Sequence, residues 1–152
     1  MKKITITKKQ EERQIDFIET EHQLQVQAVN KLFLGEKEGV EKDYWREIQK
    51  KICSYRQQDI KKKRLTDEFI TMDQTLEMLV SSQLTCYYCK KKVLVLYSNV
   101  RQKDQWTLER MNNMVGHTQN NVVISCLDCN LKRRCSNSDY FKFTKQLKIL
   151  KN

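Results

Sequence analysis

The chain contains no proline and only three glycines among its 152 residues. Because these residue types interrupt helices most strongly, their scarcity favours long helices. No run approaches the roughly 20 apolar residues that cross a bilayer, so we expect no contact with a membrane. Residues 1–10 lack the apolar core of a secretion signal. The sequence therefore predicts an intracellular protein of the cytoplasm or nucleus that is not secreted.

Acidic residues are scarce in the second half of the chain. Lys and Arg number 16 against 15 Asp and Glu in residues 1–83, and 13 against 4 in residues 84–152, which gives net charges of +1 and +9. A segment this positive repels itself unless an anion is near. Nucleic acid is the simplest such partner, because the release of counterions drives its binding. We expect double-stranded DNA first, with RNA as the alternative.

Apolar residues recur at steps of three and four along the first half of the chain. This spacing predicts an amphipathic helix over residues 8–34 that ends at Gly35. Its apolar positions are Ile15, Ile18, Val26, Val29 and Phe33. A second helix is expected from Val40 into the charged run 61–64. The two helices would form a helical hairpin.

A capping box predicts the start of a third, shorter helix from Met72 to about Ser82. Thr71 and Gln74 would exchange hydrogen bonds between side chain and backbone at its first turn. Its buried face would be Leu76, Leu79 and Val80. The first half carries no chemical motif, and we expect its hairpin to dock on the second half or on a partner. The alternative is an arm that forms a homodimer or a larger assembly.

The second half changes to short β-rich runs at residues 93–97, 106–108 and 122–124. Helix returns from Leu131, and a final basic helix is expected over Asp139–Leu150. The sequence thus predicts an α+β protein. A helical N-terminal region over residues 1–83 would precede a small module over residues 84–152.

Two C-x-x-C pairs lie in the second half, over residues 86–89 and 126–129. A two-residue gap lets both thiolates of a pair reach one metal from a tight turn, and two pairs complete a tetrahedron. In a reducing compartment such pairs are typical of metal sites rather than of disulfides. We therefore predict a structural zinc ion held by Cys86, Cys89, Cys126 and Cys129. A closed four-sulfur site leaves no open position for catalysis.

The residues between and after these pairs form a recognisable pattern. Residues 106–113 are Trp-Thr-Leu-Glu-Arg-Met-Asn-Asn, residues 116–117 are Gly-His, and Asn121 leads through the second C-x-x-C pair to Asn130 and a basic helix. This resembles the HNH endonucleases (His-Me finger, endonuclease VII-like), above all the subgroup of large DNA viruses and phages, with the pattern LDRID…GH…N…C-x-x-C-N. The resemblance covers roughly residues 70–150.

The resemblance implies a ββα fold of the treble-clef type around a catalytic Mg²⁺ or Mn²⁺, which would hydrolyse DNA phosphodiester bonds. By position, Glu109 matches the metal-binding acid, Asn121 the central Asn that orients the loop, and Asn130 the final metal position. Arg110 stands where better-known members have a general-base histidine, and the viral subgroup shares this arginine. His117 would act either as the base or as a packing residue of the loop.

The pattern departs from the family at Asn112, where the subgroup has an acid. The loss of a charged oxygen disfavours Mg²⁺. Two functions therefore remain open. The module is either an active metal-dependent endonuclease or an HNH-like fold without chemistry that binds DNA or RNA or serves as an architectural component. A viral protein of this kind would belong in a viral factory or a virion.

Basic residues cluster after both cysteine pairs and along the final helix. We expect these clusters to contact phosphates, which positions a nucleic acid without selecting its sequence. The alternative is an ordinary solvated surface. The candidate contacts are Lys90, Lys91, Lys92, Lys132, Arg133, Arg134, Lys142 and Lys145. Tyr87, Tyr88 and Trp106 are expected in the core rather than stacked on bases.

Overall fold

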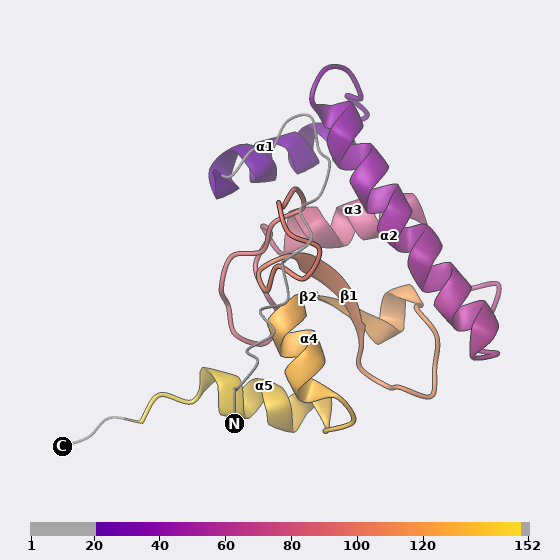
Figure 1. Cartoon of the computed structure of the whole chain (residues 1–152), viewed down its shortest axis with the longest axis vertical. Helices are drawn as coiled ribbons and strands as arrows, with labels where there is room; N and C mark the ends of the chain where they lie inside the picture. Colours follow the sequence, from indigo (N-terminus) through magenta and orange to yellow (C-terminus); the bar gives the residue numbers. More distant parts are fainter. Residues whose placement is uncertain (1–20, 150–152) are drawn as a thin grey trace, which may run out of the picture.

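The computed structural model describes residues 21–149, which form five α-helices and a two-stranded sheet (Figure 1). The helices α1 (His22–Phe33), α2 (Glu41–Lys61) and α3 (Met72–Ser81) come first. They are followed by β1 (Trp106–Arg110), a 3-10 turn η1 (Gln119–Asn121), β2 (Val122–Cys126), α4 (Leu127–Arg133) and α5 (Ser138–Gln146). The α+β class with a helical first half is thereby confirmed.

Helix α1 buries Val29 as predicted and packs Val26 against the core, but the predicted Phe33 does not belong to its buried face. Phe33 is 48% exposed, whereas the buried positions are Gln25, Ala28, Val29 and Leu32. Gln25 can be buried because its amide donates to the carbonyl of Leu96 at 2.9 Å and accepts the backbone N–H of Val95 at 2.7 Å. The earlier part of the predicted helix, with Ile15 and Ile18, lies outside the described residues.

Helix α3 begins with the predicted capping box. The Thr71 hydroxyl accepts the backbone N–H of Gln74 at 3.2 Å, and the Gln74 side chain accepts the backbone N–H of Thr71 at 3.0 Å. These two bonds satisfy groups that a helix start leaves open. Leu76 and Leu79 are buried as predicted.

Strand β1 pairs antiparallel with β2, with Trp106 opposite Cys126 and Glu109 opposite Val123. Helix α2 covers the other edge of β1. The Lys51 ammonium donates to the Trp106 carbonyl, and the Leu108 N–H donates to the Tyr55 hydroxyl at 3.2 Å. These side chains satisfy backbone groups that an edge strand would otherwise expose.

The predicted strand over residues 93–97 is not formed. Val93 N donates to Leu84 O at 2.9 Å, and Gln25 accepts from both Val95 N and Leu96 N. Leu94 N also donates to Asp104 O at 2.9 Å, and Leu94 O accepts Trp106 N at 3.0 Å. The segment therefore pairs with the start of β1 at the isolated bridge between Leu94 and Gln105, while Gln25 serves its next residues. The final helix is also shorter than predicted, because α5 ends at Gln146. The predicted end, Leu150, lies outside the described residues.

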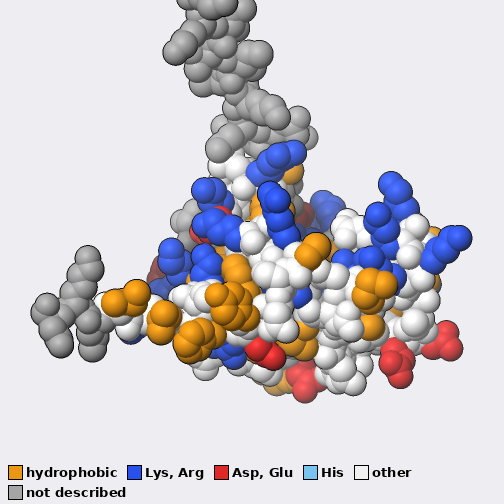
Figure 2. Space-filling model, turned by 90° about the horizontal axis from the view of Figure 1, so that it is seen from below, with side chains coloured by type: hydrophobic (Ala, Val, Ile, Leu, Met, Phe, Trp, Pro, Cys, Tyr) orange, Lys and Arg blue, Asp and Glu red, His pale blue; other side chains and the backbone are white. Residues whose placement is uncertain are grey.

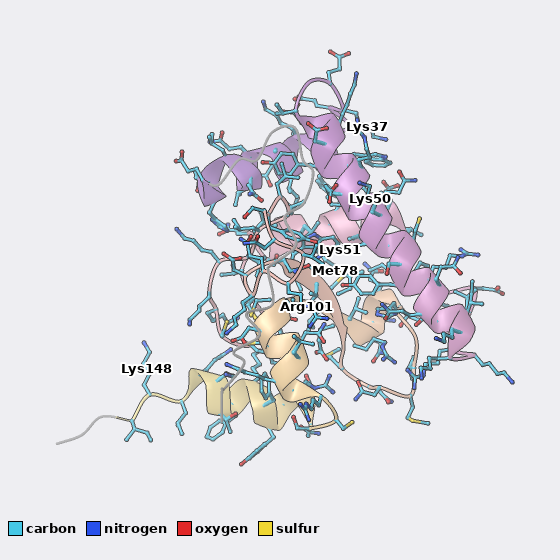
Figure 3. All side chains as sticks on the ribbon, in the orientation of Figure 1. Lys37, Lys50, Lys51, Met78, Arg101 and Lys148 are labelled. Atoms are coloured by element: carbon cyan, nitrogen blue, oxygen red, sulfur yellow. The ribbon has the colours of Figure 1, made fainter. Side chains whose placement is uncertain are left out.

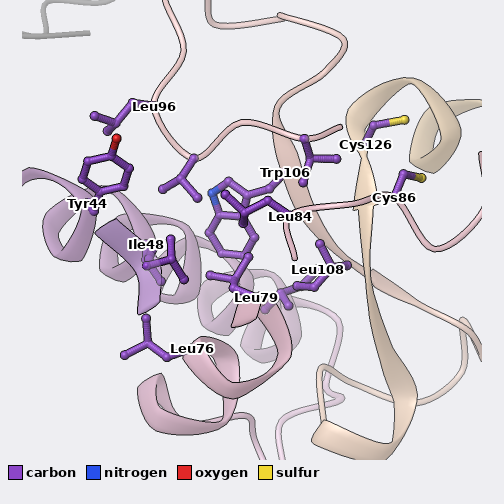
Figure 4. Packing of buried hydrophobic residues seen from close by; sticks show 14 of the residues in the cluster. Tyr44, Ile48, Leu76, Leu79, Leu84, Cys86, Leu96, Trp106, Leu108 and Cys126 are labelled. Atoms are coloured by element: carbon purple, nitrogen blue, oxygen red, sulfur yellow. The ribbon is translucent and has the colours of Figure 1, made fainter. Parts of the chain in front are cut away.

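The two halves share one hydrophobic core (Figure 4). Ile48 of α2 and Leu79 of α3 pack in the same buried cluster as Leu84, Trp106 and Leu108 from beyond residue 83. Tyr88 and Trp106 are fully buried, as expected from their size and apolar rings. Over residues 21–149, none of the helices is long and apolar enough to cross a membrane.

Candidate metal centre and basic surface

The two C-x-x-C pairs meet in space. The sulfur atoms of Cys86, Cys89, Cys126 and Cys129 all lie within 4.8 Å of one another, and those of Cys89 and Cys126 are 3.9 Å apart. Four sulfurs bound to one tetrahedral zinc ion at about 2.3 Å are separated by about 3.8 Å. The cluster therefore fits a metal such as zinc.

Tight backbone turns place these sulfurs. The first pair sits on a loop in which Cys86 N donates to Lys91 O at 2.8 Å and Lys90 N to Cys86 O at 3.0 Å. The second pair begins where β2 ends, and the Cys126 sulfur accepts the N–H of Cys129 at 3.4 Å in the first turn of α4. Two segments far apart in sequence thus present their thiols to one point.

The thiols compete for protons. Hydrogen bonds from Cys126 and Cys129 lower the pKa of Cys86, whereas the hydrogen bonds with Cys126 and Cys86 raise the pKa of Cys129. Four sulfurs this close cannot all ionise without a cation, because like charges repel at short range. A metal ion would remove that conflict, since its binding releases the thiol protons. The exposed Cys53 and Cys135 lie outside the cluster.

Glu109, the candidate metal-binding acid, is engaged on both oxygens. Its carboxylate is 5% exposed, accepts the Tyr88 hydroxyl at Oε2 and accepts the Arg133 guanidinium at Oε1. Burial raises the pKa of Glu109, and the Tyr88 hydrogen bond and the Arg133 charge oppose that rise. A protein cation therefore lies on the carboxylate that the family resemblance assigns to Mg²⁺.

Arg133 does not belong to the basic surface on which the sequence places it. Its side chain is 3% exposed, because the guanidinium also donates to the carbonyls of Arg110, Met111 and Ser136. A guanidinium has five N–H donors in a fixed fork, and this pocket of carbonyls and a carboxylate matches them. Arg133 therefore holds the end of β1 to α4 instead of facing solvent.

Asn121 fixes the loop between the two strands. Its amide NH₂ donates to the carbonyls of Asn112, Val115 and Gly116 at 3.0–3.2 Å, and its oxygen accepts the backbone N–H of Asn112 at 2.9 Å. The Arg110 guanidinium donates a hydrogen bond to the Val115 carbonyl of the same loop. Asn121 and Arg110 therefore hold the loop that connects the two strands.

An Asn121→Ala variant is expected to be less stable by about 2–4 kcal/mol, because the substitution leaves several loop carbonyls without a donor. Urea denaturation of the purified chain measures this loss. An Asn120→Ala variant is the matched control, since that neighbouring side chain is exposed. Equal stability of the two variants would show that the loop does not depend on the Asn121 amide.

Asn130 lies one turn of α4 before Arg133, on the side that faces β1. Its amide donates to the Thr107 hydroxyl at 3.1 Å, and that hydroxyl donates to the Ser125 carbonyl at 2.9 Å. Asn130 therefore contacts β1 at Thr107, whereas Glu109 on the same strand is bonded to Tyr88 and Arg133. The two candidate metal positions are held apart in separate hydrogen-bond networks.

His117 pairs with a carboxylate that the sequence did not point to. Its Nδ1 lies 2.8 Å from Asp59 Oδ1, its backbone N–H donates to Asp59 Oδ2 at 2.7 Å, and its ring packs 4.6 Å from that of Tyr55. Gly116 lets this contact form, because a Cβ there would lie 2.7 Å from Asp59 Oδ2. The pair is 3–4% exposed and joins the strand-connecting loop to α2.

The stability of the protein is expected to fall between pH 7.5 and pH 5.5 because of His117. Burial lowers the pKa of His117 below its ordinary value of 6.5, against the opposing effect of Asp59. Below pH 6.5 the unfolded chain therefore binds more protons than the folded one, which favours unfolding. Thermal melts across this range measure the slope. His117→Gln should flatten the slope, whereas an unchanged slope in that variant would contradict the assignment.

A group of lysines surrounds Asp128 on α4. The Lys132 ammonium lies 3.0 Å from its carboxylate, and the charges of Lys132, Lys103 and Lys145 together lower the pKa of Asp128. The carboxylate is thus bonded to one ammonium group of α4 and lies within electrostatic range of two more, from α5 and the loop before β1.

A second lysine group surrounds Tyr87, between the first two cysteines. The Lys142 ammonium lies 3.9 Å from the centre of the half-buried Tyr87 ring, and that of Lys90 lies 5.9 Å away. Lys142 and Lys145 are three residues apart on α5, so this helix joins the two lysine groups. Lys91, Lys92 and Arg134, which the sequence also assigns to this surface, are exposed.

We call the five lysines of these two groups the basic rim: Lys90, Lys103, Lys132, Lys142 and Lys145. Figure 2 shows the molecule from the side of α4 and α5, where many Lys and Arg side chains lie along one border of the face and most of the visible Asp and Glu lie toward the opposite border. Lys103 was missed from the sequence, where it stands beside Asp104 with no basic run around it.

Comparison with protein-family models, curated proteins and solved structures gives no match to this chain.

Proposed function

We propose that the second half of the chain is a structural zinc module that binds nucleic acid through the basic rim, with double-stranded DNA as the first expected partner. The observation that carries this proposal is the convergence of five lysines on the surface around the cysteine cluster. The zinc ion would hold together two turns that each bring lysines to this surface. Its four sulfurs would leave no position for a substrate.

The pattern of charge favours a polyanion over a small acidic ligand. The rim extends from Lys90 to Lys103 across α4 and α5. Asp128, bonded to Lys132, is an acidic group that lies within it. Ammonium groups spread over a surface can each contact a different phosphate of one backbone. Each such contact releases counterions and so increases the affinity. A single small anion would engage only a few of them.

We propose that this module does not cleave its partner. The carboxylate of Glu109 already has a buried cation and a hydroxyl as partners, so Mg²⁺ would have to displace the Arg133 guanidinium. Asn112 supplies no second acid, and its side chain instead accepts the N–H of Met114 at 2.9 Å. His117 is buried against Asp59 rather than paired with Glu109. These contacts favour a binding module over an endonuclease.

A Lys142→Ala and Lys145→Ala double variant is expected to bind a 20-base-pair duplex about tenfold more weakly at low salt, and to reduce the slope of log affinity against log salt by about two. Fluorescence anisotropy at several salt concentrations measures both quantities. A Lys37→Ala and Lys50→Ala double variant is the control of equal charge, because Lys50 lies on α2 and Lys37 on the loop before it, away from α5 (Figure 3). Equal losses in both double variants would contradict a localised rim.

A plasmid-nicking assay with Mg²⁺ or Mn²⁺ tests the absence of cleavage. The expected result is intact plasmid at protein concentrations that bind it. Nicking that disappears in a Glu109→Ala variant would instead assign an endonuclease activity to this carboxylate. Nicking that persists in that variant would indicate a contaminating nuclease.

A further inference from the structure

A cavity of about 310 Å³ lies between α2 and the ββα part of the chain, apart from the basic rim. Helix α2 supplies Lys51, Tyr55 and Gln58, and α4 supplies Leu127 and Asn130. Its volume is at the lower end of the range for small-molecule sites. The function proposed above does not use this cavity.

The cavity is lined by neutral hydrogen-bonding groups. Among residues 21–149, the Gln58 side chain makes no hydrogen bond, and Asn130 uses its NH₂ on Thr107 but leaves its amide oxygen free. The Tyr55 hydroxyl accepts the N–H of Leu108, and burial raises its pKa, so it keeps a proton to donate. Two amides and a hydroxyl therefore offer both donors and acceptors to one space.

The charge of the lining does not suit a phosphate. Lys51 is its only cation, and the ammonium is already bonded to the side chain of Gln105 at 2.9 Å and to the carbonyl of Trp106. No acidic side chain lines the cavity. Leu127, the Tyr55 ring and the Lys51 stem supply apolar surface. A flat, neutral molecule with donors and acceptors on its edge fits this lining best.

We propose that this cavity receives one unstacked nucleobase of the nucleic acid held on the basic rim, an inference that rests on the proposed function. Asn and Gln side chains pair with base edges through their adjacent donor and acceptor. Leu127 lines the cavity and adjoins Asp128, to which Lys132 of the rim is bonded, so a strand bound along the rim would lie next to the cavity. A base inside a duplex stays stacked, whereas a base of a single strand can turn into such a site.

Binding of three probes by the full chain tests this inference: a 12-residue deoxyadenosine strand, an abasic strand of the same length, and a duplex. We expect the deoxyadenosine strand to bind about tenfold tighter than the abasic strand. Gln58→Leu should reduce that difference to about twofold without changing duplex binding. Gln57→Leu, on an exposed neighbour outside the cavity, should leave it unchanged.

The outcomes separate the two proposals. Equal binding of the abasic and deoxyadenosine strands would overturn the base site but leave the rim intact. A base preference that survives both Gln58→Leu and Asn130→Leu would likewise overturn it, because the bases would then bind elsewhere. If neither the strands nor the duplex bind at low salt, the proposed function itself fails.

Discussion

A Cys129→Ser variant is expected to lose its tightly bound metal and the cooperative unfolding transition of the chain. The sulfur of Cys129 is buried among three others, and a serine hydroxyl there is a much weaker ligand. Metal binding in small modules of this kind supplies folding free energy on the order of 10 kcal/mol. The cysteines belong to the same core as α2 and α3, so the loss should spread beyond the module. Circular dichroism melts and metal analysis measure both effects.

The control for this substitution is Cys135→Ser, which changes an exposed thiol outside the cluster. That variant should retain both the metal and the melting temperature. A strong chelator should reproduce the effect of Cys129→Ser on the unchanged chain. If Cys129→Ser melts like the unchanged chain, the cluster is not what holds this part of the protein together.

Replacing Arg133 with methionine is expected to lower the free energy of unfolding by about 3–5 kcal/mol, because it leaves a buried carboxylate without its cation. Glu109 would keep only the Tyr88 hydroxyl, and the carbonyls of Arg110, Met111 and Ser136 would lose their donor. Guanidinium chloride denaturation measures the change. The effect should be among the largest of any single substitution outside the cysteines.

Two further variants decide whether the ion pair is the cause. Arg134→Met removes the neighbouring exposed charge and should change stability by less than about 0.5 kcal/mol. Adding Glu109→Gln to Arg133→Met should recover about 1 kcal/mol or more, because the stranded charge is removed. An Arg133→Met variant no less stable than Arg134→Met would contradict the buried pair.

Short sequence patterns predicted the cysteine turns, the start of α3 and the two strands. The C-x-x-C spacing predicted a cluster whose four sulfurs the structure brings together. The Thr71 and Gln74 pair predicted the start of α3, and the β-branched runs predicted β1 and β2. The capping box, the strands and each C-x-x-C pair depend on residues within a few positions of one another, so spacing carries the information. The meeting of the two pairs was predicted from the four ligands that a tetrahedral metal needs.

Contacts between distant segments could not be predicted in this way. The buried Gln25 accepts the backbone N–H groups of Val95 and Leu96, which lie about 70 residues away. Arg133 stands in a basic run, and nothing in its neighbours distinguishes it from the exposed Arg134. Asp59 lies 58 residues before His117, and Tyr88 lies 21 residues before Glu109. Only the fold reveals these partners.

The helices of the first half have one of the roles expected for them. Gln25 of α1 and Lys51 of α2 bond to Leu96 and Trp106, so these helices dock on the second half of the same chain. Their buried faces are covered by that contact. Assembly into a homodimer or a larger complex stays a prediction, which light scattering at several protein concentrations would test.

X-ray absorption spectroscopy at the zinc edge, on the purified full chain with its metal content determined in parallel, tests the central claim most directly. We predict one zinc ion per chain with four sulfur neighbours at about 2.3 Å. A folded chain without zinc, or a zinc ion whose neighbours are nitrogen and oxygen, would contradict the four-cysteine centre and the basic surface organised around it.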